Sequence, residues 1–152
     1  MIPTKHSLRL AAIVAFLATT IGTAYGHVTI QPKQSTAGAS VKYTMRVPTE
    51  KFVPTVRIEV EFPGALNVSS FESKPEWKIE EKKDASDRVS GATLTGSIAP
   101  GESPEFNFMA RNPGEEGKLS FKVIQIYQDG SKSEWTGPEG SRTPAPVTEV
   151  KK

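Results

Sequence analysis

The stretch VKYTMRV (residues 41–47) alternates apolar and polar side chains with a period of two, and so does VRIEVEF (residues 56–62). Successive side chains of an extended strand point to opposite faces, so each stretch has one apolar and one polar face. β-branched and aromatic residues occupy most of the apolar positions, as is typical of half-buried strands. The two stretches therefore predict strands that cover a common core.

Further segments show the same alternation less regularly: residues 67–71, 77–81, 88–98, 105–111 and 117–128. Turn sequences rich in Pro and Gly separate them, and Asp129-Gly130 predicts a hairpin. Apolar Ile124 and Ile126 interrupt the alternation in the last segment, which predicts a bulge or a strand covered on both faces. Because no segment has helical spacing, the sequence predicts an all-β fold, an immunoglobulin-like antiparallel β-sandwich of about seven to nine short strands.

The first 26 residues have the composition of a secretory signal peptide. Basic Lys5 and Arg9 precede an apolar run over residues 10–24, and small Ala24 and Gly26 stand at positions −3 and −1 of a cleavage site. The expected organisation is a signal peptide at 1–26, a β-sandwich domain at 27–136 and a disordered tail, rich in Pro, Gly and charge, at 137–152. The predicted location is secreted, in the periplasm or at the cell surface.

The charge balance excludes one class of partner. Removing 26 of the 152 residues leaves 126, and the leader takes two of the 19 basic residues but none of the 17 acidic ones. The mature chain then has 17 residues of each sign, so no basic face for nucleic acid is expected. No second apolar segment follows the leader, so no membrane span is expected in the mature chain.

Cleavage after Gly26 makes His27, the sole histidine of the remaining chain, its first residue. The α-amine and the imidazole of such a residue can close a chelate ring on one metal ion, and these nitrogen donors bind Cu²⁺ most tightly among the first-row divalent ions. One alternative is that His27 follows the cleavage boundary by chance. Another is cleavage after Ala24, which starts the chain at Tyr25 and surrounds Cu²⁺ with four nitrogens in a square plane.

The remaining composition weighs against enzymes and soft metal sites. A copper monooxygenase also uses an N-terminal histidine but requires a second one, and none follows His27. The chain has no cysteine, and Met45 and Met109 are expected in the core, so the available donors suit Cu(II) better than Cu(I). The prediction is that the chain is not an enzyme. The alternative to a metal-binding protein is an immunoglobulin-like adhesion or partner-binding module.

Four segments match one known pattern in order: GHVTIQPKQSTAGASVKYTMRVPTE (26–50), KPEW (74–77), PGESPEFNF (100–108) and LSFKVIQIYQDGSKSEW (119–135). Together they resemble the YcnI-like copper-binding domain family. The resemblance implies a secreted β-sandwich that binds one Cu(II) ion per chain through a mono-histidine brace.

Carried over by position, the resemblance implies that the amine and imidazole of His27 hold the ion. Trp135 would lie close to the metal, and Glu50 is a candidate carboxylate ligand. From their positions alone, Trp135 and Trp77 are each expected to be core aromatics. The implied role is copper trafficking, delivery or homeostasis, with another copper-trafficking protein as the partner.

Overall fold

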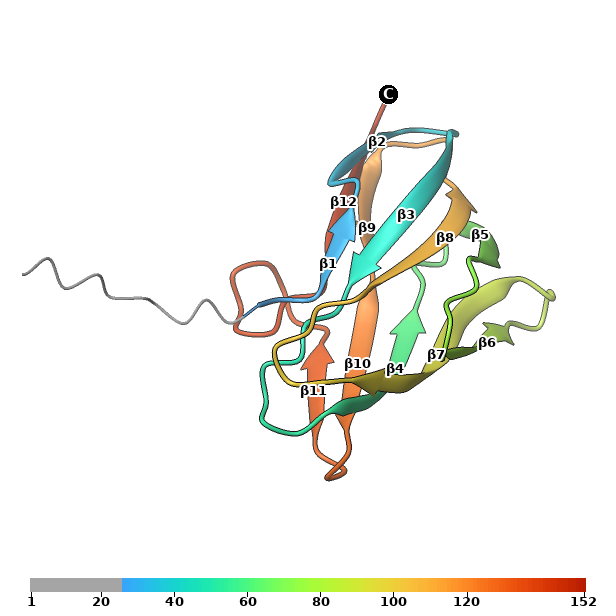
Figure 1. Cartoon of the computed structure of the whole chain (residues 1–152). Helices are drawn as coiled ribbons and strands as arrows, with labels where there is room; N and C mark the ends of the chain where they lie inside the picture. The colour runs from blue at the N-terminus through green and yellow to red at the C-terminus, as the bar shows by residue number, and fades with distance from the viewer. Residues whose placement is uncertain (1–25) are drawn as a thin grey trace, which may run out of the picture.

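The two alternating stretches form two strands of the same sheet of a β-sandwich in the structure, a computed structural model that describes residues 26–152 (Figure 1). The predicted signal peptide lies outside the described residues, apart from Gly26. Within the described range there is no helix long and apolar enough to cross a membrane. The strands are β1 (Thr29–Gln31), β2 (Gln34–Thr36), β3 (Ser40–Arg46), β4 (Thr55–Glu61), β5 (Asn67–Phe71), β6 (Lys78–Lys83), β7 (Val89–Ile98), β8 (Glu105–Arg111), β9 (Gly117–Ser120), β10 (Lys122–Tyr127), β11 (Lys132–Trp135) and β12 (Val147–Lys151).

These strands form two sheets around one core. The larger sheet has nine strands in the order β1-β3-β8-β5-β7-β4-β10-β11, with β6 paired to β7, and the smaller sheet has the order β2-β12-β9. All pairs are antiparallel except β2 with β12. Side chains from distant parts of the chain meet inside, since the Tyr43 and Phe121 rings lie 5.7 Å apart and the Phe62 and Phe108 rings 5.1 Å apart. The predicted immunoglobulin-like β-sandwich is confirmed, with more and shorter strands than expected.

The alternating faces point as the sequence predicts. In β3 and the residue after it, Tyr43, Met45 and Val47 are buried, and in β4 Ile58 and Val60 are buried. The prediction that both methionines lie in the core is wrong for Met109, which is 39% exposed on β8. Its neighbours along β8 on either side are buried, so the alternation of the strand turns Met109 outward.

The expected single strand at 117–128 is divided between the two sheets. β9 pairs with β12 in the small sheet, β10 pairs with β4 and β11 in the large one, and buried Phe121 lies at the crossing. In β10 the side chains of Gln125 and Tyr127 point into the core, so Ile124 and Ile126 lie on the opposite, partly exposed face. The predicted bulge is present as a shift in register between Ile126 and Tyr127 opposite β4.

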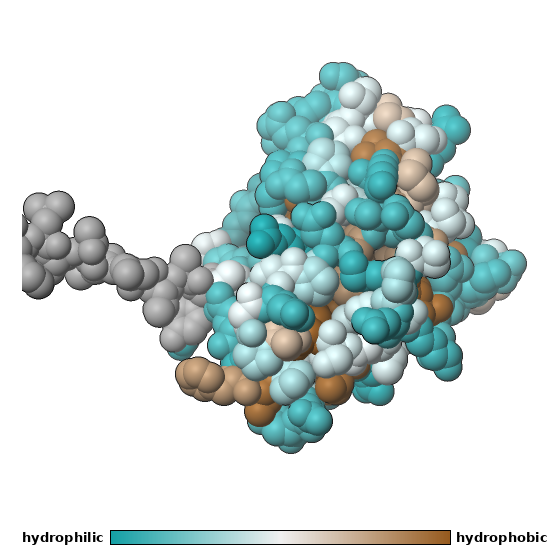
Figure 2. Space-filling view, viewed as in Figure 1, coloured by the Kyte–Doolittle hydropathy of each residue, from teal (hydrophilic) through white to brown (hydrophobic). Residues whose placement is uncertain are grey.

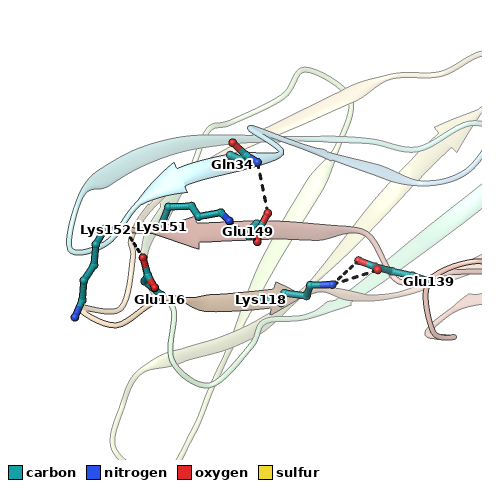
Figure 3. Close-up of polar contacts among 7 residues, drawn as sticks. All are labelled: Gln34, Glu116, Lys118, Glu139, Glu149, Lys151 and Lys152. Carbon is teal, nitrogen blue, oxygen red and sulfur yellow. Dashed lines mark hydrogen bonds and ion pairs between the residues drawn. The ribbon is translucent and has the colours of Figure 1, made fainter.

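The expected disordered tail at 137–152 is wrong for its C-terminal part. β12 is the middle strand of the small sheet, and Val150 is 1% exposed. Figure 3 shows the polar contacts that surround it, including the hydrogen bond from Gln34 to Glu149 and the ion pair between Lys118 and Glu139. β12 is short, and the strands that pair with it on both sides are remote in sequence. Its own residues carry no strong local pattern, so composition alone misassigns it.

Candidate functional site

The start of the described chain lies beside the segment that follows β3. Thr29 pairs with Arg46 in antiparallel register, and continuing that register past both strand ends brings the terminal residues beside residues 48–50. The backbone N–H of Gly26 donates a hydrogen bond to the Glu50 carboxylate. A Cβ on Gly26 would meet that carboxylate at 3.0 Å and the Pro48 ring at 3.2 Å. The chain therefore enters the domain in close contact with Glu50.

The β10–β11 hairpin brings Trp135 to the same place. Its ring centroid lies 5.7 Å from that of His27, with the planes tilted by 55°. Trp135 is 7% exposed, and its indole N–H donates to Gln125 Oε1 at 3.1 Å inside the core. Because the N–H is occupied there, Trp135 contributes ring carbon surface toward His27. The predicted Asp129-Gly130 hairpin is confirmed, since β10 and β11 pair directly across it.

The three predicted metal-site residues line one cavity of about 500 Å³. Its lining consists of His27, Pro48, Glu50, Lys51, Tyr127, Ser133, Trp135, Arg142 and Thr143. His27 and Glu50 are exposed, so they are accessible to a solvated ion. Trp77 lies elsewhere, packed edge-on against Phe106 at 4.8 Å, as expected for a core aromatic.

Part of the cavity wall comes from the segment that composition assigned to the tail. The loop between β11 and β12 is closed by backbone hydrogen bonds from Gly137 N to Thr143 O and from Ala145 N to Gly137 O. A Cβ on Gly137 would lie 2.5 Å from Ser141 Oγ and 3.0 Å from the Thr143 carbonyl oxygen, so the loop packs closely over this glycine. The closed loop holds Arg142 and Thr143 at the cavity.

Charged and polar groups on the other wall are partly engaged with one another. The Lys51 ammonium lies 4.3 Å from the centre of the Tyr127 ring and donates to Ser131 Oγ at 3.0 Å. Burial raises the pKa of the Tyr127 phenol, and the charge of Glu50 adds to this effect, while the hydrogen bond with Ser133 opposes it. In the metal-free protein Tyr127 is therefore a neutral phenol at physiological pH, hydrogen-bonded to Ser133.

The surface around the cavity combines apolar and polar groups. Figure 2 shows apolar atoms gathered at the lower end of the molecule, where Figure 1 places the β3–β4 connection and the β10–β11 hairpin. Phe52, in that connection two residues after Glu50, is fully exposed. Apolar surface thus lies close to the mouth of the cavity.

One residue that the sequence does not single out lies directly behind the cavity. Gln125 is fully buried, and its side-chain amide bonds to Trp135, Pro48 and Thr55. The sequence signal that could have revealed Gln125 is its spacing. It lies two residues from Val123 and two from Tyr127, whose side chains point into the core, so the alternation of the strand points the Gln125 side chain inward as well. This signal was hard to see because Ile124 and Ile126, on the opposite face of the strand, are apolar too.

The donor set fits a borderline divalent ion. Imidazole nitrogen and carboxylate oxygen come from His27 and Glu50, and an α-amine on His27 would add a second nitrogen. Across residues 26–152, no three His, Cys, Asp or Glu side chains lie close enough together to hold a metal ion. A metal at this cavity would therefore need a backbone or terminal nitrogen, or water, to complete its coordination.

Fold and cavity together define an immunoglobulin-like β-sandwich with nitrogen and oxygen donors at one loop end. Residues 27–150 match the family described as "Domain of unknown function (DUF1775)", and the chain belongs to this family, the domain family of YcnI. The resemblance found in the sequence is thus confirmed. The matched region begins at His27 and ends within β12, at residue 150, so the family domain continues past residue 136.

Comparison with individual proteins supports the same family and fold. The chain is 36% identical over 141 residues to "Copper-binding protein CutI" of Bacillus subtilis (strain 168), covering 91% of this chain and 69% of that protein. A Nocardia farcinica protein with an immunoglobulin-like fold superposes with a TM-score of 0.72 at 24% identity, covering 83% of this chain and 99% of that one. A cohesin module from Clostridium perfringens has a TM-score of 0.55 at 13% identity, covering 83% and 95%. These two structures show a shared fold only.

Proposed function

We propose that this protein is a secreted Cu(II)-binding protein of copper trafficking or homeostasis. It binds one ion per chain at the cavity lined by His27, Glu50 and Trp135. Its relative in Bacillus subtilis is a copper-binding protein by name, and the alignment with it covers 91% of this chain at 36% identity. A site built from such nitrogen and oxygen donors binds Cu²⁺ more tightly than the other first-row divalent ions.

The contact between Gly26 and Glu50 is the observation that carries the proposal. Cleavage after Gly26 removes the N–H that bonds to the Glu50 carboxylate and creates an α-amine on His27, the next residue. One cut thus frees an oxygen donor and generates a nitrogen donor on the same side of the cavity. Cleavage after Ala24 would leave Gly26 in place, with its N–H bonded to one oxygen of the Glu50 carboxylate.

The role we assign to Trp135 is to shield the ion and to offer it an aromatic face. The side chain is nearly buried, and its ring lies against His27. An aromatic face attracts a cation more strongly where water is excluded. Two cationic side chains, Lys51 and Arg142, also line the cavity, so a second metal ion is disfavoured.

The same donor atoms also determine how the protein can release the ion to a partner. Cu(I) prefers thiolate and thioether ligands, and the residues that line the cavity include neither cysteine nor methionine. Reduction therefore weakens binding and favours transfer to a partner with softer ligands. In this proposal the protein binds and hands over copper and performs no catalysis. An oxidative copper enzyme would need the second histidine that the sequence lacks after His27.

The test compares three N-termini of the secreted domain. Protein that begins at His27 should bind one Cu(II), with a nitrogen-rich tetragonal electron paramagnetic resonance spectrum. The same protein with its α-amine acetylated keeps the imidazole, and His27→Gln keeps the amine; each should lose most of the affinity in competition with a chelator. If the acetylated protein binds as tightly as the free one, the brace is wrong. N-terminal sequencing of secreted protein tests the cleavage site directly.

A further inference from the structure

We infer that Gln125 is the positioning residue of the copper site: its side-chain amide fixes the orientation of Trp135 and ties it to the segment that carries Glu50. The inference rests on the proposed function. Gln125 lies behind the cavity and is fully buried, so it acts on the ion only through the residues that it holds.

The amide of Gln125 joins three structural elements. Its Oε1 accepts a hydrogen bond at 3.1 Å from the indole N–H of Trp135 at the end of β11. Its Nε2 donates at 2.8 Å to the carbonyl of Pro48, two residues before Glu50, and at 2.6 Å to Thr55 Oγ1 at the start of β4. Both hydrogens of the amide and its oxygen are therefore used.

Only one orientation of the amide satisfies these partners. The Pro48 carbonyl can only accept, and the Trp135 N–H can only donate. A flipped amide would place donor against donor and acceptor against acceptor. A glutamate at 125 would place an acceptor against the Pro48 carbonyl, and an aliphatic residue would leave that carbonyl and the indole N–H unpaired in the core.

The position of Gln125 in the sheet makes these hydrogen-bonded contacts rigid. Its strand β10 pairs on one side with β4, where Gln125 lies opposite Ile58, and on the other side with β11, opposite Ser133. Thr49 and Thr55 complete the buried polar group with a hydroxyl–hydroxyl hydrogen bond of 2.6 Å. Two walls of the cavity, Trp135 and the 48–50 segment, are thereby fixed to one strand, β10, which is paired on both sides.

Trp77 serves as an internal reference. Its ring packs against Phe106 and over Gly96, and within residues 26–152 no side-chain hydrogen bond holds its indole. A loss of the Gln125 contact should therefore change Trp135 and leave Trp77 as it is.

The experiment starts from metal-free protein beginning at His27. In Gln125→Met, the indole N–H resonance of Trp135 should shift and exchange with solvent faster, while that of Trp77 stays unchanged. The control is Thr55→Val, which removes another partner of the same amide but keeps the Trp135 contact. It should leave the Trp135 resonance in place. An unchanged Trp135 resonance in Gln125→Met would overturn the inference without involving copper.

Copper binding by these variants then tests whether Gln125 supports the metal site. We expect Gln125→Met to bind Cu(II) about threefold to tenfold more weakly and to shift the electron paramagnetic resonance spectrum, because the aromatic face is no longer aligned with the ion. In a Trp135→Phe background, Gln125→Met should add little, since the contact is already absent. An equal loss in both backgrounds, or the same spectral change in Thr55→Val, would mean that Gln125 is only structural.

Failure of the proposed function looks different. If the wild-type protein binds no Cu(II), the copper site is wrong, whereas the indole resonances still report whether Gln125 holds Trp135. Should Gln125→Met fail to fold, Trp135→Phe removes the same hydrogen bond from the other side and keeps an aromatic ring. An unchanged copper spectrum in that variant would overturn the inference.

Discussion

Replacing Val150 by alanine removes two methyl groups from the core beneath the C-terminal strand. Val150 is 1% exposed and pairs with Gly117 of β9 and Ser35 of β2. Two methyl groups contribute about 1.6 kcal/mol at about 0.8 kcal/mol each, and the cavity left behind brings the expected loss of unfolding free energy to about 2 kcal/mol. For a domain of this size that corresponds to a fall in Tm of roughly 6–12 °C.

The neighbouring Lys151→Ala is the matched control. Lys151 is exposed, and its side chain forms an ion pair with the partly exposed Glu149, so its loss should change the unfolding free energy by less than about 0.5 kcal/mol. Thermal unfolding followed by circular dichroism measures both variants. Truncation after Thr136 goes further, because it removes β12 and the loop that carries Arg142 and Thr143. That chain should lose about 5 kcal/mol or more and be largely unfolded.

A disordered tail would give the opposite pattern. If Val150→Ala melts within a degree or two of wild type, and if the truncated chain melts cooperatively near the wild-type temperature, then β12 is not part of the domain. The cavity would then have no wall from this segment, and the reasoning about its shape would fail together with that about stability.

Three further outcomes follow from the site and the core. Cu(II) should quench the fluorescence of Trp135 far more than that of Trp77, as single-tryptophan variants can measure; quenching confined to Trp77 would place the ion elsewhere. Glu50→Gln should weaken Cu(II) binding about tenfold through the loss of a charged ligand, whereas Glu134→Gln, exposed on β11, should not, and equal effects would count against Glu50 as a ligand. The buried amide of Asn112 accepts a hydrogen bond from the Tyr43 hydroxyl and donates to Ser35 Oγ and to the Thr36 carbonyl. Asn112→Ala removes all three bonds and should lose about 2–4 kcal/mol of unfolding free energy in chemical denaturation; a loss within the error of the fit would contradict these contacts.

Much of the fold was predictable because the relevant information is local. Alternation in residues 41–47 and 56–62 identifies β3 and β4, because burial on one face is written directly into every second residue. The Asp129-Gly130 turn likewise predicts the hairpin that carries Trp135. Signals of this kind need no knowledge of the rest of the chain.

The prediction failed where a segment depends on remote partners. β12 has no regular alternation of its own and is stabilised by β2 and β9, about thirty to more than one hundred residues away in the chain. Gln125 is a polar residue among the inward-pointing side chains of β10, and its three hydrogen-bond partners come from different parts of the structure. A buried polar residue is favourable only where such partners surround it, and they are not visible in its neighbours along the chain.

By itself the sequence determined the all-β class, the strands with clear alternation, the family and the candidate residues His27, Glu50 and Trp135. Tertiary structure alone decided that these three residues line one cavity, because they are brought together by the β1–β3 register and the β10–β11 hairpin. It also decided that the presumed tail closes one wall and that Gln125 supports another. The physical reason is that periodic burial acts on each strand separately, whereas a site arises where loops meet, and loop positions depend on how all the strands pair.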